Sequence, residues 1–272
     1  MVREITTSRF VVLSPARRAI SSAFHNRQGN SRQHSKLLAS MQRFRGAIYA
    51  SDGAVPVQAL TEDGRHVAAG DDEAWHLISV GPTGSVRACL RYVEETDADD
   101  FDSLLVRHAA AAESDLGPAY RRAVERELVR ARREGLRFGE VGGWAVDEKL
   151  RNSTESIKIL LAMYGLLELL GGCLGVATAT WRHQSAAILR RIGLSALESD
   201  GMELPPYFEP FYDCQMELLR FDSRNPNARY QEMVQNFSAT LRTAPVYCAG
   251  DASRQVESET WDRFDLPELA VA

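Results

Sequence analysis

The stretch "FGEVGGWAVDEKLRNSTESIKILLAMYGLLELLGG", residues 138–172, constrains the fold most. A glycine-spaced apolar run over 139–146 predicts a strand, and polar residues follow it. Apolar side chains then recur at positions 157, 160, 161, 164 and 167, which is the spacing of one helix face and predicts a helix over 153–170. Gly171 and Gly172 then end this helix. A strand, a short polar turn and a helix in this order often hold a small ligand at the helix start.

The polar turn before this helix has the composition of an anion site. Asn152 is a good N-cap, and Glu155 three residues later makes a start like a capping box. The free N–H groups of a first helical turn favour an anion, and Arg151, Ser153 and Thr154 add donors. Glu155 opposes a highly charged diphosphate, and no G-x-G-x-x-G or G-K-[ST] nucleotide motif is present. A capped helix with a polar first turn explains the same residues without a ligand.

Strand and helix patterns alternate along the rest of the chain. We predict short strands at 45–50 and 57–60, a strand over 86–92, and helices within 101–135 that are split at Gly117-Pro118. A buried strand over 174–180, a short helix ending at Gly193, a strand over 214–222 and a helix over 227–242 follow. This order predicts an α/β or α+β single domain with a mixed sheet.

Charge divides the chain into three parts. Residues 1–45 contain nine Lys/Arg and a single acid, Glu4, although the whole chain has a net charge of −5. We therefore expect a basic, flexible arm over 1–40, a domain over 41–245 and an acidic tail over 246–272. Such an arm suits an acidic partner, a membrane surface or nucleic acid, and it also resembles an organelle transit peptide. No nucleic-acid motif is present, so nucleic acid is not expected as a partner.

The remaining composition favours a cytoplasmic protein without a membrane span. The four cysteines are scattered and form no C-x-x-C pair or zinc spacing, so we expect free thiols, no metal and a reducing compartment. No apolar run reaches about 18 residues, since Glu168 interrupts the best candidate. The N-terminus lacks the charged and apolar segments of a secretory signal.

Five motifs, in order along residues 40–195, resemble one family. They are "RGAIY" from Arg45, "EDG" followed by "DDEAWHL" around Asp71, "VRACLR" ending near Arg91, "GEVGGWAV" around Glu140, and the β–turn–helix–β–helix order that ends in "RRIGL". Together they resemble the GCN5-related N-acyltransferase (GNAT) fold, in its branch of autoinducer synthases and N-acyl amino acid synthases. The resemblance implies a mixed, mostly antiparallel central sheet with splayed strands, flanked by helices. It also implies transfer of a medium or long acyl chain from acyl carrier protein, or from acyl-CoA, to the amine of a small acceptor such as an amino acid.

The resemblance assigns roles to individual residues. Glu140 becomes the base, because a carboxylate in an apolar strand is desolvated and its pKa should rise. Val146 and its neighbours offer backbone N–H groups to the thioester carbonyl. The acyl-donor-binding residues are then Trp144, Ala145, Val146, Arg151, Asn152, Ser153 and Thr154, and the acceptor-binding residues are Arg91, Arg45 and Asp71. A solvated Glu140, a surface Arg91, a core Trp144 and a structural His76 are the simpler readings. No cofactor is expected to be tightly bound; the thioester is a co-substrate.

The chain also departs from the family. Gly142-Gly143-Trp144 stands where autoinducer synthases have Ser-Arg-aromatic, and Arg65 and His66 stand where carboxylates are expected, which argues against S-adenosylmethionine as acceptor. The helix after the second splayed strand lacks the tyrosine that many acetyltransferases use to protonate the leaving thiolate. The missing arginine and tyrosine leave open a catalytically inactive module that binds an acyl chain or a partner. An acetyl-CoA-dependent acetyltransferase is a further alternative, which requires tight CoA binding despite Glu155. An acyl tunnel beside the 101–135 helices is expected for a long chain.

Overall fold

A computed structural model describes residues 9–16, 20–95, 100–151 and 153–249. One large sheet forms the centre, with strand order β10-β11-β6-β5-β4-β3-β1-β12-β2, and β7 pairs with β11 at its edge. The principal strands are β1 (Arg9–Leu13), β3 (Ala74–Val80), β4 (Val86–Glu94), β5 (Arg137–Val146), β6 (Cys173–Thr180) and β11 (Cys214–Asp222). The short strands are β2 (Arg27–Gln28), β7 (Ser195–Ala196), β8 (Glu198–Ser199), β9 (Met202–Glu203), β10 (Tyr207–Glu209) and β12 (Val246–Tyr247). The α-helices are α1 (Ser31–Ser51), α2 (Ala110–Glu113), α3 (Gly117–Arg133), α4 (Glu155–Leu169), α5 (Ser185–Ile192) and α6 (Gln231–Thr243).

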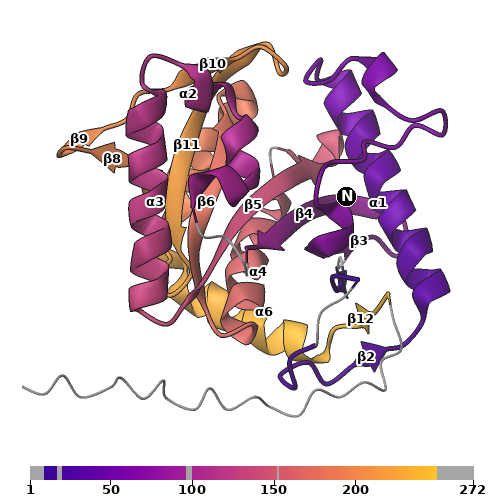
Figure 1. The fold of residues 1–272 in the computed structure, drawn as a ribbon. Helices are drawn as coiled ribbons and strands as arrows, with labels where there is room; N and C mark the ends of the chain where they lie inside the picture. Colours follow the sequence, from indigo (N-terminus) through magenta and orange to yellow (C-terminus); the bar gives the residue numbers. More distant parts are fainter. Residues whose placement is uncertain (1–8, 17–19, 96–99, 152, 250–272) are drawn as a thin grey trace, which may run out of the picture.

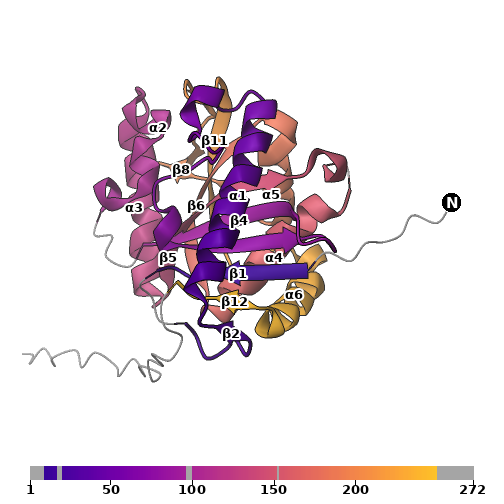
Figure 2. The ribbon, with the colours of Figure 1, turned by 90° about the vertical axis from the view of Figure 1, so that its right-hand side faces the viewer.

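Helices cover both faces of the sheet (Figures 1 and 2). Side chains alternate across a strand, and β4 shows it: Ala88, Leu90 and Tyr92 join the core under α4 and α6, whereas Cys89 joins the core under α1. A third core lies between α3 and strands β6 and β11. Pairing is parallel between β5 and β6 and around β12, and antiparallel elsewhere in this sheet. The predicted α/β class and the mostly antiparallel mixed sheet are confirmed.

Two predicted strands are wrong. Residues 45–50 belong to α1, where the side chain of Asn30 caps the helix by accepting a hydrogen bond from the amide of Gln33. The side chains at 37, 38, 41, 44 and 48 of α1 pack on the sheet at helical spacing, which overrides the short β-like run. Residues 57–59 form a single 3₁₀ turn (Val57–Ala59) rather than a strand.

The ends of the described chain are part of the sheet. Strand β1 lies within the segment expected to be a flexible arm, yet Val12 and Leu13 are fully buried and β1 pairs with β3. Its apolar sequence RFVVL is the reason, since such a run gains stability by burial. Residues 31–40 form the first half of α1, and β12 lies just beyond the expected domain boundary at 245 and pairs with β1. Among the described residues, no helix has the length and apolar character that crossing a bilayer requires.

Glycine allows β5 and β6 to pack closely at their first halves. A Cβ on Gly175 would lie 2.0 Å from the carbonyl oxygen of Gly139, and a Cβ on Gly139 would lie 2.5 Å from that of Val93. Real Cβ atoms do not approach that closely, so side chains larger than hydrogen are excluded at both positions. Gly142, later in β5, has no atom closer than 4.0 Å to an added Cβ.

We predict that Gly139→Ala lowers the free energy of unfolding by about 3 kcal/mol, because backbone would have to move. The matched variant Gly142→Ala should leave it unchanged or slightly raised, since glycine is a weak strand former. Urea denaturation of both variants measures the difference. Equal stability of the two variants would contradict this account of the β4–β5–β6 contact.

Candidate active site

Strands β5 and β6 separate halfway along their length. Their parallel pairing runs from Arg137↔Cys173 to Val141↔Ala177 and stops there, although β5 continues to Val146 and β6 to Thr180. The β4–β5 register shifts over the same stretch, and Gly143 has a φ of 64°, in the region that favours glycine. The predicted splayed pair is therefore confirmed.

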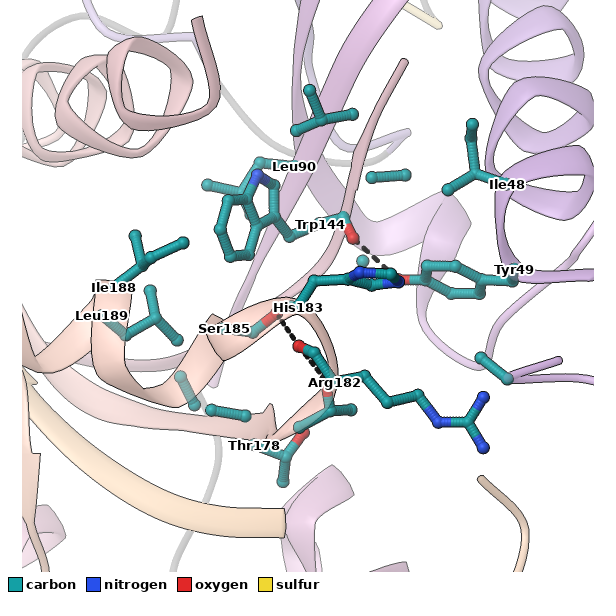
Figure 3. A pocket seen from close by; sticks show the side chains of 18 of the residues that line it. Ile48, Tyr49, Leu90, Trp144, Thr178, Arg182, His183, Ser185, Ile188 and Leu189 are labelled. Carbon is teal, nitrogen blue, oxygen red and sulfur yellow. Dashed lines mark hydrogen bonds between the residues drawn. The ribbon is translucent and has the colours of Figure 1, made fainter. Parts of the chain in front are cut away.

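A cavity of about 190 Å³ occupies this gap (Figure 3). Its inner wall is apolar and includes Leu90, Val141, Leu160, Ala177, Ala179, Ile188 and Leu189. Its other part is lined by the polar side chains of Asp52, Arg151, Arg182 and His183. The lining comes from α1 and the segment after it, β4, β5, α4, β6, α5, β11 and the connections between them, including the one from β10 to β11, and residues 101–135 contribute none of it. The acyl tunnel expected beside those helices is thus not where the cavity lies.

The backbone of Val146 is directed into the gap. The amide of Asp147 donates to the carbonyl of Arg87 at 2.8 Å, and Val146 stands opposite Ala88. Hydrogen-bonded and non-hydrogen-bonded pairs alternate in an antiparallel ladder, so Val146 is at a non-hydrogen-bonded position. Its N–H therefore points away from β4, toward the side on which β6 has separated.

Three residues of β5 that were predicted to bind the donor line the cavity: Trp144, Ala145 and Val146. The indole ring of Trp144 is half-buried and packs on the main core, so the simpler reading, a core tryptophan, describes part of its role. Figure 3 shows its ring between Leu90 and the α5 side chains Ile188 and Leu189.

Of the predicted turn residues that the structure describes, only Arg151 lines the cavity. Asn152 lies outside the described residues, and Thr154 is the N-cap of α4. The hydroxyl of Ser153 donates to the carbonyl of Leu150 at 2.7 Å and is used within the turn. Glu155 is paired with Lys158 at 2.6 Å, so its charge is largely neutralised locally. Arg151 instead makes two hydrogen bonds to the carboxylate of Asp52, at 2.7 and 2.9 Å.

Glu140 lies on the opposite face of β5 from Val141 and is not part of the cavity lining. Its Oε1 accepts a hydrogen bond from the amide of Val106 at 3.1 Å. Burial, with a smaller contribution from the nearby charge of Glu95, raises the pKa of Glu140 to about 7. Glu140 is therefore not a solvated surface carboxylate, and a group with this pKa can accept a proton near neutral pH.

The three residues predicted to bind the acceptor form one network. The carboxylate of Asp71 lies 2.5 Å from Nη2 of Arg45 and 3.0 Å from Nη1 of Arg91. Although burial alone would raise it, the hydrogen bonds and charge of Arg45 hold the pKa of Asp71 below its usual range. Arg45 and Asp71 are 0% and 3% exposed, so they support Arg91 from beneath and do not present a surface to a ligand. The side chain of Arg91 is 17% exposed.

His76 belongs to the same buried network. Its Nε2 lies 2.7 Å from the carbonyl oxygen of Asp71, and its side chain is 1% exposed. Burial lowers the pKa of His76 to about 4, which keeps the ring neutral. The structural reading of His76 therefore fits.

Two cavity-lining tyrosines were not predicted from the sequence. The hydroxyl of Tyr49, on α1, donates to the carbonyl of Trp144 at 3.3 Å (Figure 3). Tyr212 follows β10, far away in the sequence. Burial raises the pKa of both tyrosines, and the charges of Arg45 and Arg91 oppose that rise. The charge of Arg91 also opposes the rise in the pKa of Glu140. One arginine is therefore within electrostatic reach of Tyr49, Tyr212 and Glu140.

Comparisons with known proteins support the fold. No protein-family model matches the chain, and no curated protein matches its sequence. A solved structure of the CoA-dependent acyl-homoserine lactone synthase BjaI, with SAM and isopentyl-CoA, matches with a TM-score of 0.52 at 11% identity, over 89% of this chain and 92% of that one. The CoA-dependent acyl-homoserine lactone synthase MesI matches with a TM-score of 0.51 at 14% identity, over 85% of this chain and 95% of that one.

At these identities the likeness concerns the fold. The chain has the fold of the acyl-homoserine lactone synthases, which is a GNAT-like fold. The resemblance seen in the five sequence motifs is confirmed at this level.

We predict that Asp71→Asn lowers the free energy of unfolding by about 3–5 kcal/mol, because it leaves the buried Arg45 without its counter-charge. The matched variant is Asp63→Asn, which removes an exposed carboxylate that also pairs with two arginines, Arg43 and Arg65. That variant should show no resolvable change, since exposed ion pairs contribute little. Urea denaturation tests both. A small effect of Asp71→Asn would show that the network is not a support of the fold.

Proposed function

We propose that the protein is an N-acyltransferase that moves an acyl group from a pantetheine thioester to the amine of a small acceptor. The observation that carries this proposal is the gap between β5 and β6, where an apolar cavity meets a backbone N–H that has no neighbouring strand to bind. That combination suits a thioester: the apolar wall takes the acyl and pantetheine chains, and the N–H donates to the carbonyl oxygen.

The donor in this proposal enters from the polar part of the cavity. Its phosphate interacts near Arg151, its pantetheine arm lies between the splayed strands, and its carbonyl oxygen approaches the N–H of Val146. A developing oxyanion there is stabilised by a fixed dipole, an effect typically worth about 10²–10³ in rate. The donor is a thioester of acyl carrier protein or of CoA. The presence of isopentyl-CoA in the BjaI structure keeps CoA in consideration.

The acceptor in this proposal approaches from the face that holds Glu140 and Arg91. The amine nitrogen attacks the thioester carbon, the C–N bond forms, and the C–S bond breaks to release the pantetheine thiolate. Glu140 takes the proton of the amine through a water molecule, and the products are an amide and a thiol. Arg91 is placed to bind an acceptor carboxylate, which favours an amino acid.

Tyr212 is the better of the two tyrosines for returning a proton to the thiolate. A hydroxyl whose proton is held by a carbonyl, as in Tyr49, is a poor acid, and Tyr49 instead anchors the splayed part of β5 at Trp144. Tyr212 lines the same cavity; burial raises its pKa, and the positive charges of Arg91 and Arg45 limit that rise. After transfer, the phenolate recovers a proton from solvent or from Glu140.

S-adenosylmethionine is not favoured as acceptor. The chain has Gly143 where the autoinducer synthases have an arginine, and a Cβ added there would lie 3.0 Å from Nη1 of Arg45. The space that a side chain would need is therefore taken by the buried network. A catalytically inactive acyl-binding module is the second candidate, favoured by the same departure.

We predict that intact mass spectrometry detects an amide when acyl carrier protein or acyl-CoA thioesters are incubated with a pool of amino acids. Glu140→Gln should lower kcat by about 10² at pH 8. Because Glu140 acts as a base only when ionised and its pKa is about 7, the advantage of wild type over Glu140→Gln should grow from pH 6 to pH 8. Donor that binds but stays unchanged would support the inactive module. Equal rates of the two proteins would remove Glu140 from the mechanism.

We further predict that Tyr212→Phe lowers kcat by about 10² with little change in KM, since it removes only the proton donor. Tyr49→Phe removes a hydroxyl from the same cavity and should raise KM more than it lowers kcat. Steady-state kinetics with the best donor separates the two. A wild-type kcat for Tyr212→Phe would mean that water protonates the thiolate.

A further inference from the structure

Asp52 stands at the polar part of the cavity in an unusual electrostatic position. It is the C-cap of α1, and the last turn of that helix contains no basic residue. A negative charge at a helix C-terminus is repelled by the helix dipole, so Asp52 does not stabilise α1 by its charge. Another reason is needed for a carboxylate here.

The partners of Asp52 come from two other elements of the cavity. Arg151, after β5, binds its carboxylate through two parallel hydrogen bonds, the strong geometry for this pair. Arg182, after β6, donates to its backbone carbonyl, and Nε2 of His183 lies 3.4 Å from its Oδ1. All four residues line the cavity. The carboxylate of Asp52 therefore binds the guanidinium of Arg151, the group that a donor phosphate would use.

His183 and Gln184 strengthen the functional reading of this corner. Both are non-glycine residues with left-handed backbone, with φ of 51° and 58°. Such conformations cost free energy and are concentrated at functional sites. They hold the His183 ring beside Arg151, at 3.3 Å between Nε2 and Nη1.

We propose that Asp52 is a specificity-determining residue that selects the acyl donor by charge. Through its competition for Arg151, it disfavours donors with several phosphate charges and favours the single phosphodiester of carrier-bound phosphopantetheine. This inference rests on the proposed acyltransferase function. Asp52, rather than Glu155, then disfavours highly charged donors, because Lys158 neutralises Glu155.

The charges decide the direction of the effect. The carrier-bound phosphodiester has one negative charge, whereas the diphosphate and 3′-phosphate of CoA together have about four at neutral pH. Repulsion from a fixed carboxylate grows with the charge of the ligand. A second carboxylate, Glu148, lies at the same helix end and accepts a hydrogen bond from Ser51 at 2.8 Å, which adds to the bias.

Titration calorimetry with CoA and with free 4′-phosphopantetheine, on the full chain, tests the proposal. Asp52→Asn should tighten CoA binding by about tenfold and phosphopantetheine, which has fewer charges, by about threefold or less. Asp52→Ser serves as a second variant should Asn fail to fold, and thermal melting checks folding. Asp63→Asn, which removes an arginine-paired carboxylate outside the cavity lining, should leave both affinities unchanged.

The outcomes are distinguishable. A ratio of the two affinities that Asp52→Asn and Asp52→Ser leave unchanged overturns the role of Asp52, while binding of both ligands keeps the proposed function intact. Failure of wild type and every folded variant to bind either ligand counts against the acyltransferase itself. A loss of CoA affinity in Asp52→Asn would show that Asp52 positions Arg151 for the donor rather than competing with it.

Discussion

The partial pairing of β5 and β6 is the constraint on which the candidate site depends. Glycines let the first halves of the two strands approach so closely that Gly139 and Gly175 admit no side chain. Beyond Val141 and Ala177 the ladder ends, and the cavity and the N–H of Val146 occupy the opening. A sheet that stayed paired to its end would have consumed this N–H in a hydrogen bond and filled the space with strand.

A buried carboxylate organises the charges beside that opening. Asp71 accepts hydrogen bonds from Arg45, Arg91 and Gln42 and from the amide of Ala68, so its cost of burial is offset by several donors. The result is a fixed arginine, Arg91, whose charge acts on Glu140 and on both cavity tyrosines. Removing Asp71 would therefore disturb the proposed base and the proposed acid together, although it contacts neither.

The sequence was informative where local pattern and burial agree. Apolar patterns in the sequence indicated the strands over 86–94, 137–146, 173–180 and 214–222 and the helix over 155–169. The family resemblance indicated that β5 and β6 separate. The segment 45–50 failed because a β-like run lies inside a longer helix whose face is fixed by packing on the sheet. Strand β1 was hidden by the basic residues around it, which dominated the composition of that segment.

The unpredicted parts of the site depend on contacts distant in sequence. Asp52 and Arg151 are brought together by the fold, and nothing near either residue indicates its partner. Tyr212 likewise lies in the connection between β10 and β11, far in sequence from most of the other residues that line the cavity. Only the pairing of Glu155 with Lys158 could have been expected, since residues three apart on a helix are neighbours.

The two faces of β5 divide the proposed chemistry. Val141 faces the apolar wall that would hold the donor, whereas Glu140 faces the side from which an amine would approach. Gly142 and Gly143 follow, and they add no side chain between the two faces. In the proposed reaction the acyl group and the amine are bound on opposite faces of β5, and the missing side chains at Gly142 and Gly143 leave room for them to meet. The glycine pair, which departs from the family pattern, can thus serve transfer to an acceptor other than S-adenosylmethionine.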